Sequence, residues 1–280
     1  IKVIVAKNAG FCFGVERAIS IAKESLGENG KVYTYGPIIH NPHVVNQLEK
    51  SGISVVNDLD NLKKGDTVII RSHGITKYMY EEIESKEIKI IDATCPFVKK
   101  AYNAARELSH EGYSVVIFGD KFHPEVEGII SYIEGDYHIV SDINEALSLN
   151  CYNKIGYLAQ TTQDRKLFQD IFEVLKNKCS KIKKVDTICN ATFQRQNEAK
   201  DIAGKVDLML IIGGRNSANT KRLYQICCKI CEKTYFVESV EELKNIKFKK
   251  DYKVGISAGA STPNYLINEV LDYLNEVEYV

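Results

Sequence analysis

Three cysteines occur in the same sequence context, and three thiolates can bind a metal cluster. Cys95 follows the apolar residues 88–91 and precedes an amphipathic run, which predicts a strand, a tight turn and a helix that begins at Cys95. Cys12 and Cys189 occur in the same pattern. The positive end of a helix favours a thiolate over a thiol, so all three positions suit metal ligands.

The repeat extends beyond the cysteines. A glycine that ends an apolar run follows each cysteine by 24 residues, at Gly36, Gly119 and Gly213. A polar residue follows each glycine by four positions. These polar residues are His40, His123 and Ser217. Three copies with identical spacing indicate an internal repeat.

Three thiolates without a fourth protein ligand favour one kind of metal centre. Zinc takes four protein ligands in structural sites, or three and a water in catalytic sites. A cubane iron–sulfur cluster with three cysteine ligands and one open iron fits the repeat better. A second cysteine group, Cys227, Cys228 and Cys231, lies within a helical pattern and is expected to pack as small apolar side chains.

Several polar residues follow predicted strands and suit an anionic ligand. His40, His73 and His123 lie at strand ends, where protonated imidazoles attract a phosphate or a carboxylate. Further donors lie in turns that precede helices, where backbone N–H groups bind anions. These donors are Ser217, Asn219 and Ser261. Together they predict a binding site for an anionic substrate.

Glu125 is the one carboxylate of this strand-end set, two residues after His123. An ordinary first-turn glutamate that interacts with the helix dipole is the plain alternative. In a cavity with an open iron, Glu125 is the candidate proton donor, and Thr161 lies within plausible relay distance.

The elements that position these residues alternate as strands and helices, which predicts an α/β fold with mostly parallel sheets. We expect three similar small domains in a pseudo-threefold cloverleaf around a central cluster. Their expected boundaries are residues 13–95, 96–189 and 190–280, and residues 1–12 complete the third. Ligands of such sheets bind at the carboxyl ends of the strands.

The composition narrows the class of protein. Lys plus Arg and Asp plus Glu each number 37, so no net charge attracts nucleic acid or an anionic membrane. The chain has no apolar run of about 20 residues, as a membrane helix requires, and no secretory signal pattern. Eight cysteines in this setting indicate a reducing cytoplasm and cofactor ligation.

The motifs closely resemble the 4-hydroxy-3-methylbut-2-enyl diphosphate reductase family of the non-mevalonate pathway of isoprene biosynthesis. The matching segments are GFCFGV at 10–15, IHN at 39–41, SHG at 72–74, DATCP at 92–96, HPEVEG at 123–128, QTT at 160–162, DTIC at 186–189, NSAN at 216–219 and AGAS at 258–261. They span nearly the whole chain.

The resemblance implies a 4Fe-4S cluster on Cys12, Cys95 and Cys189 whose open iron binds the substrate hydroxyl. It implies that Glu125 supplies the proton that makes water the leaving group, and that isopentenyl and dimethylallyl diphosphate form. The implied diphosphate ligands are His40, His73, Ser217, Asn219 and Ser261, and His123 and Thr161 line the site. The implied electron donor is reduced ferredoxin or flavodoxin, and we expect a monomer.

The chain departs from the family pattern at Ala218, where a second serine is common. The backbone N–H of Ala218 remains as a donor, so we expect weaker substrate binding at most. Other open-iron enzymes, such as a dehydratase or a quinolinate-synthase-like enzyme, remain alternatives. The diphosphate site distinguishes the reductase from these enzymes, because a substrate without a diphosphate would not need it. A non-catalytic iron–sulfur sensor is a third alternative, and an open site with Glu125 and the Thr161 relay argues against it.

Overall fold

Parallel sheets of four strands dominate the fold. The computed structural model describes residues 1–27 and 31–276, and within them the chain forms three such sheets. The predicted α/β fold is therefore confirmed. The chain divides into two compact units, so the three-domain boundaries and the cloverleaf stay predictions. No helix of the described ranges is both long and apolar enough to cross a membrane.

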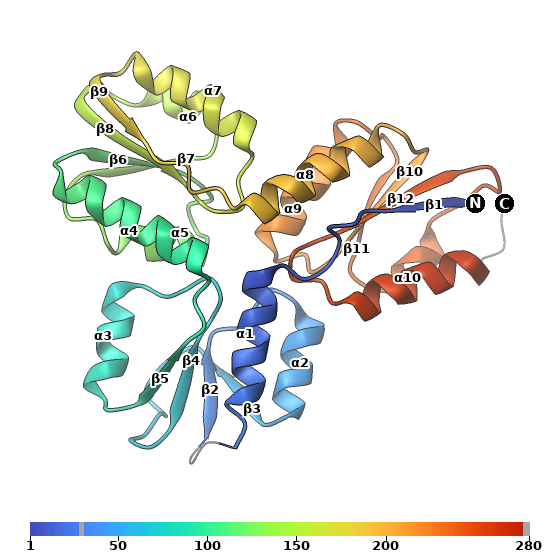
Figure 1. The fold of residues 1–280 in the computed structure, drawn as a ribbon, viewed down its shortest axis with the longest axis horizontal. Helices are drawn as coiled ribbons and strands as arrows, with labels where there is room; N and C mark the ends of the chain where they lie inside the picture. The colour runs from blue at the N-terminus through green and yellow to red at the C-terminus, as the bar shows by residue number, and fades with distance from the viewer. Residues whose placement is uncertain (28–30, 277–280) are drawn as a thin grey trace. The chain divides into compact units, whose positions relative to one another are not determined.

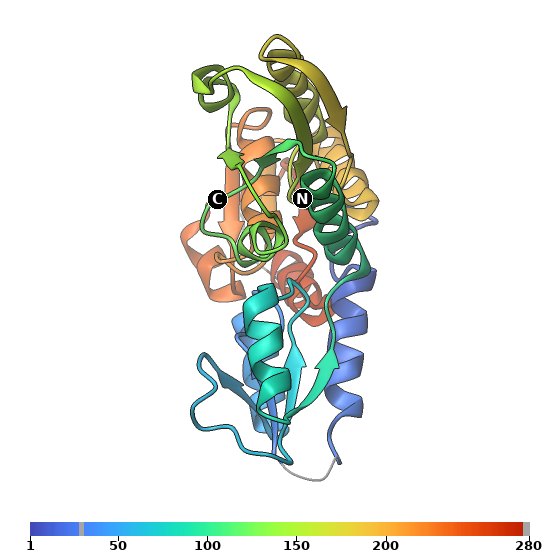
Figure 2. The ribbon, with the colours of Figure 1, turned by 90° about the vertical axis from the view of Figure 1, so that its left-hand side faces the viewer.

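The larger unit comprises residues 16–39 and 45–189 and holds two of the sheets. The first contains β2 (Val32–Tyr35), β3 (Ile53–Val56), β4 (Thr67–Ile70) and β5 (Lys89–Asp92), in the order β3-β2-β4-β5. The helices around it are α1 (Phe13–Glu24), α2 (Pro42–Lys50) and α3 (Lys77–Ser85). Figure 2 shows α3 across one face of this sheet.

The second sheet of this unit contains β6 (Ser114–Phe118), β7 (Tyr137–Val140), β8 (Tyr152–Ala159) and β9 (Cys179–Lys184), in the order β7-β6-β8-β9. Its helices are α4 (Pro96–His110), α5 (Pro124–Ile130), α6 (Ile143–Ser148) and α7 (Arg165–Lys176). Val115 and Ile117 pack in one apolar cluster, whereas Val116 and Phe118 pack in another. Alternate side chains thus fill the cores on both faces, which explains the continuous apolar run of β6.

The smaller unit comprises residues 1–15, 40–44 and 190 onward. Its sheet contains β1 (Lys2–Val5), β10 (Leu208–Ile212), β11 (Thr234–Val237) and β12 (Lys253–Ala258), in the order β1-β12-β10-β11. Its helices are α8 (Asn190–Ala203), α9 (Ala218–Cys228), a short 3₁₀ helix η1 (Val240–Asn245) and α10 (Asn264–Glu276). The first strand of the chain therefore completes the last sheet, with Val3 opposite Val254 (Figure 1).

All three sheets have the same internal order. In each sheet, the strand that runs into a repeat glycine is β2, β6 or β10. On one side it pairs with the next strand of the chain (β3, β7 or β11), and on the other side with a third strand (β4, β8 or β12). A fourth strand at the edge (β5, β9 or β1) leads to a repeat cysteine. The N–H of each glycine donates to a valine carbonyl of the adjacent strand. These bonds join Gly36 to Val56 (2.7 Å), Gly119 to Val140 (3.0 Å) and Gly213 to Val237 (2.9 Å). The internal repeat of the sequence is therefore a repeat of structure.

Candidate active site

The three repeat cysteines are held in the same way. Each directly precedes a helix: Cys12 precedes α1, Cys95 precedes α4 and Cys189 precedes α8. The backbone N–H of each cysteine donates to the carbonyl of the second residue after a neighbouring strand. These bonds run from Cys95 to Ser72 (3.0 Å), from Cys189 to Thr161 (3.0 Å) and from Cys12 to Ala260 (3.1 Å). The same turn, with a cysteine at the start of the following helix, therefore occurs three times in the chain.

An aspartate fixes the turn before two of these cysteines. Asp92 accepts the N–H of Thr94 at 2.9 Å, and Asp186 accepts the N–H of Ile188 at 3.1 Å. Lys99 pairs with Asp92 at 2.5 Å. Burial alone would raise the pKa of Asp92, but hydrogen bonds from Lys99 and Thr94 lower it. An ionised carboxylate therefore holds the backbone N–H groups that shape this turn.

A buried arginine holds the turn before Cys12. Arg195 of α8 is 3% exposed and donates from Nε to the carbonyl of Asn8 and from Nη2 to the carbonyl of Gly10, each at 2.8 Å. Glu198, one helical turn further, accepts the N–H groups of Lys7 (2.6 Å) and Asn8 (2.9 Å). Arg195 was not predicted, because nothing in a helical sequence pattern marks which arginine faces inward.

None of the eight cysteines, which all lie in the described part of the chain, forms a disulfide. Cys12, Cys95 and Cys189 are each partly exposed. Cys227 and Cys231 are buried in an apolar cluster, and burial raises the pKa of Cys227 to about 12. The packing role is thus confirmed for these two cysteines, whereas it is wrong for Cys228, which is exposed because it lies on the outer face of α9.

Glu125 lies at the start of α5 and is 1% exposed. Its Oε1 accepts the backbone N–H of Thr161 at 2.7 Å, and its Oε2 accepts the Thr161 hydroxyl at 2.9 Å. Burial raises the pKa of Glu125 to about 7, although the bonds from Thr161 oppose that shift. The carbonyl of the same threonine holds Cys189. The structure thus brings together the predicted donor, its predicted relay residue and one predicted metal ligand.

Two of the predicted histidines are neighbours in the larger unit. His123 caps α5, and its Nδ1 accepts the N–H of Glu125 at 3.1 Å. An Nδ1 that accepts this bond leaves Nε2 as the nitrogen of the ring that can donate. The ring of His73 lies edge-on to that of His123, with 5.6 Å between centroids.

In the smaller unit, the segment of His40 lies against the turn after β12. The side-chain amide of Asn41 donates to the carbonyl of Ser261 at 2.8 Å, and the Ser261 hydroxyl donates to the carbonyl of His40 at 3.4 Å. A Cβ at Gly214 would stand 2.7 Å from that carbonyl, so only glycine permits this approach. The predicted ligands His40 and Ser261 are therefore joined within one unit.

The remaining predicted ligands lie at the start of α9. Ser217 caps the helix, and its hydroxyl accepts the N–H of Thr220 at 3.3 Å. Ala218 is the first helical residue and is partly exposed. Asn219 is 4% exposed, and neither atom of its amide has a hydrogen-bond partner within the described residues. Since a buried amide without partners is costly, Asn219 is poised for a ligand.

Fold and site together define an α/β protein of three repeated parallel sheets, in which each repeat has a cysteine at the start of a helix. The family model described as LytB protein matches residues 3–275. The chain therefore belongs to the LytB family.

Curated relatives cover almost the whole chain. A 4-hydroxy-3-methylbut-2-enyl diphosphate reductase of Geobacter sulfurreducens is 46% identical over 277 residues, which are 99% of this chain and 98% of the relative. The reductase of the same name from Geotalea uraniireducens is 48% identical over 276 residues, with the same coverage. The chain is thus similar to these reductases from end to end.

Two solved structures agree with this assignment. One is a structure of (E)-4-hydroxy-3-methyl-but-2-enyl diphosphate reductase, described as the terminal enzyme of the non-mevalonate pathway. It is 44% identical, with a TM-score of 0.70, and the alignment covers 99% of this chain and 100% of that one. The other is the E-1-hydroxy-2-methyl-but-2-enyl-4-diphosphate reductase from Plasmodium falciparum. It is 30% identical, with a TM-score of 0.91, and the alignment covers 99% of this chain and 89% of that one.

Proposed function

We propose that this chain reduces 4-hydroxy-3-methylbut-2-enyl diphosphate to isopentenyl and dimethylallyl diphosphate. The observation that carries the proposal is the buried pair of Glu125 and Thr161, whose threonine also holds the backbone of Cys189. A proton source is thereby linked to a thiol ligand. The reductases to which the chain is similar over nearly its full length support the same reaction.

The three repeat cysteines fit an iron–sulfur cluster. Cys12, Cys95 and Cys189 are partly exposed and form no disulfide, and each lies at a helix start, where the dipole favours the thiolate. We propose that they hold one 4Fe-4S cluster and leave one iron open. When bound, such a cluster supplies electrons and a Lewis-acidic site for an oxygen atom.

Glu125 would deliver the proton that turns the leaving hydroxide into water. With a pKa of about 7, a large share of this carboxyl carries a proton at neutral pH. Thr161 fixes both carboxyl oxygens and offers a hydroxyl that can pass a proton between Glu125 and the substrate. The reaction balances with two electrons and two protons: one proton leaves in water, and the other is added to a carbon of the allyl fragment.

We propose that the diphosphate is bound by histidines, by the start of a helix and by a buried amide. In the larger unit, His123 offers Nε2–H, and His73 lies beside it. In the smaller unit, the helix start at Ser217 and Ala218 provides backbone N–H groups, and Asn219 provides its buried amide. We place His40 and Ser261 in the same role. A fixed diphosphate positions the reacting C–O bond, which is proximity catalysis.

The test is an anaerobic assay with reduced methyl viologen and the hydroxylated diphosphate. We expect turnover to both isomeric diphosphates. Conversion of the corresponding alcohol without a diphosphate would favour a dehydratase or a quinolinate-synthase-like enzyme. A loaded cluster with no turnover of either compound would favour a sensor, and either result would overturn the proposal.

The ligand set has its own test, which does not require activity. Replacing Cys12, Cys95 or Cys189 by serine is expected to lower the iron and sulfide content per chain and the brown absorbance. Cys228→Ser is the matched control, because Cys228 is an exposed thiol outside the repeat. Full iron content in Cys95→Ser would contradict the assignment.

We further propose that the electrons come from reduced ferredoxin or flavodoxin and that the enzyme acts as a cytoplasmic monomer. The family to which the chain belongs supports the electron donor. Eight cysteines without a disulfide support a reducing compartment such as the cytoplasm.

A further inference from the structure

The hydroxyl of Tyr102 links the helix of Cys95 to the loop of His73. Tyr102 lies on α4, seven residues after Cys95, and two helical turns place both on the same face of the helix. Its Oη donates to the carbonyl of His73 at 2.9 Å. The N–H of Cys95 donates to the preceding carbonyl, that of Ser72, at 3.0 Å. Helix α4 therefore holds two consecutive carbonyls of one short segment.

Two glycines make room for this hydroxyl. A Cβ at Gly74 would stand 2.9 Å from Cζ of Tyr102, and a Cβ at Gly128 would stand 2.6 Å from it; both would be closer still to Oη. Gly74 directly follows His73, with φ of 74°. Gly128 lies on α5, the helix that His123 caps and that carries Glu125. The hydroxyl of Tyr102 thus lies where α4, α5 and the His73 loop meet.

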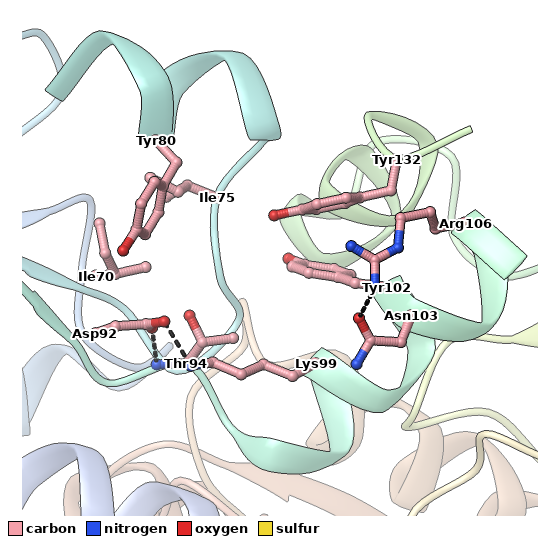
Figure 3. A pocket seen from close by; sticks show the side chains of 10 residues that line it. All are labelled: Ile70, Ile75, Tyr80, Asp92, Thr94, Lys99, Tyr102, Asn103, Arg106 and Tyr132. Atoms are coloured by element: carbon pink, nitrogen blue, oxygen red, sulfur yellow. Dashed lines mark hydrogen bonds and ion pairs between the residues drawn. The ribbon is translucent and has the colours of Figure 1, made fainter. Parts of the chain in front are cut away.

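The Tyr102 ring is buried in the core of the larger unit and borders a cavity. The ring stacks on Tyr132, with 5.0 Å between centroids and 25° between planes. The cavity beside it has a volume of about 280 Å³ (Figure 3). It is lined in part by Asp92, Lys99, Arg106 and the rings of Tyr80, Tyr102 and Tyr132. The stack fixes the plane of the ring, and the hydrogen bond to His73 fixes the direction of its hydroxyl.

The hydroxyl remains a donor at every physiological pH. Tyr102 is 6% exposed, and burial together with the nearby charge of Glu125 raises its pKa far above the usual range of tyrosine. The bond to the carbonyl is therefore permanent, and its role is geometric.

We propose that Tyr102 is a positioning residue, which sets the place of the His73 imidazole next to His123 through the His73 carbonyl. This role deepens the proposed function, since it rests on His73 as a ligand of the diphosphate. Tyr102 touches no substrate in this scheme. It acts through the backbone of His73 and through α5.

The test separates KM from kcat. Tyr102→Phe keeps the ring and its stack on Tyr132 and removes only Oη. We expect KM for the diphosphate substrate to rise about fivefold, the factor that a lost neutral hydrogen bond of about 1 kcal/mol gives, while kcat changes less than about twofold. Tyr132→Phe is the matched control, because it removes a tyrosine hydroxyl from the same cavity without a bond to His73. Its KM should equal that of the wild type.

A double substitution, in which Tyr102→Phe is combined with His73→Asn, distinguishes a positioning role of Tyr102 from a merely structural one. In a His73→Asn protein, Tyr102→Phe should leave KM unchanged, because the imidazole that it positions is gone. If Tyr102→Phe fails to fold, Gly128→Ala serves instead, since its Cβ would push Oη away from the His73 carbonyl. We expect the same rise in KM and the same loss of effect in His73→Asn.

The outcomes are distinct. An unchanged KM in Tyr102→Phe, or the same rise in KM in both backgrounds, would overturn the positioning role while leaving the proposed function intact. A wild-type protein that does not turn over the diphosphate substrate would overturn both.

Discussion

Glu125 is a carboxyl with both oxygens committed to one threonine, in a place where water does not reach it. Glu125→Gln preserves the size of the side chain and an oxygen that accepts the Thr161 N–H, but it removes the proton that the proposed reaction transfers. We expect kcat to fall by about 100-fold or more, the typical contribution of a general acid, while substrate still binds. The measurement is kcat and KM in the anaerobic assay.

The control for this substitution lies on the same turn of helix. Glu127 is also in the first turn of α5, but its side chain is exposed. Glu127→Gln should therefore keep near-normal kcat. Near-normal turnover in Glu125→Gln would remove the carboxyl from the role of proton donor.

The raised pKa of Glu125 predicts a pH dependence with a definite sign. The donor form is the protonated one, so kcat/KM should fall as the pH rises through about 7. The residual activity of Glu125→Gln should lack this fall, and a wild-type profile that rises through pH 7 would contradict the prediction.

The raised pKa of Glu125 also affects the stability of the fold. Its contribution to the free energy of unfolding is fully present below the ordinary pKa of 4.5 and is lost as the pH rises through about 7.

Sequence patterns locate such residues better than they describe their surroundings. Glu125 stands out because it follows a strand beside His123, and the three cysteines stand out because their context repeats. The bonds between Glu125 and Thr161 join residues 36 positions apart, so only the folded chain reveals them. Tyr102 gave no signal, because its ring fits an ordinary helical pattern and its function depends on one atom at the end of the ring.

At the scale of elements, the approach of α4 to β8 depends on a glycine. A Cβ at Gly156 in β8 would stand 2.9 to 3.0 Å from three side-chain atoms of Leu108 in α4. We expect Gly156→Ala to lower the free energy of unfolding by about 2 kcal/mol, because overpacking forces the helix away from the sheet. Urea denaturation measures this change.

Two controls identify the cause. Gly204→Ala introduces a Cβ with only ordinary contacts, the nearest at 3.7 Å, and should be nearly neutral. Combining Gly156→Ala with Leu108→Ala should cost less than the sum of the two single substitutions, since the smaller side chain makes room for the new methyl group. Strict additivity would show that the collision with Leu108 is not the cause.

Short edge strands were the elements that the sequence concealed. Apolar runs predicted the central strands β4, β6 and β10, which are buried on both faces. β7 and β11 have four residues each, and only one residue of β7 and two of β11 are fully buried, so their apolar pattern is weak. Their place in the sheet follows from pairing with β6 and β10, which a local pattern does not contain.

At the scale of the whole molecule, the first strand completes the last sheet. The N–H of Lys2 donates to the carbonyl of Tyr252, just before β12, and that of Ala6 donates to Ile256 in β12. Because N–H groups alternate in direction along a strand, that of Ile4 also faces β12, whereas that of Val5 faces away. Ile4→Pro removes a ladder bond and should loosen β1 and the turn of Cys12. We expect iron per chain to fall by about a third or more, since this turn carries one of three proposed ligands.

The matched control is Val5→Pro, which introduces the same ring on the outer side of the edge strand. Its iron content should stay close to that of the wild type, as measured by anaerobic iron and sulfide analysis together with limited proteolysis of the N-terminal segment. Equal iron loss in both variants would mean that strain, and not the lost ladder bond, causes the effect.

The placement of β1 also constrains how the protein is made. A ribosome synthesises β1 before its partner β12, which emerges only after nearly 250 further residues, because β12 begins at Lys253. At the usual rates of translation the nascent strand waits about 12 to 50 seconds for its neighbour. If Cys12 binds the proposed cluster, assembly of that cluster would follow the synthesis of β12, and until then β1 lacks the strand with which it pairs.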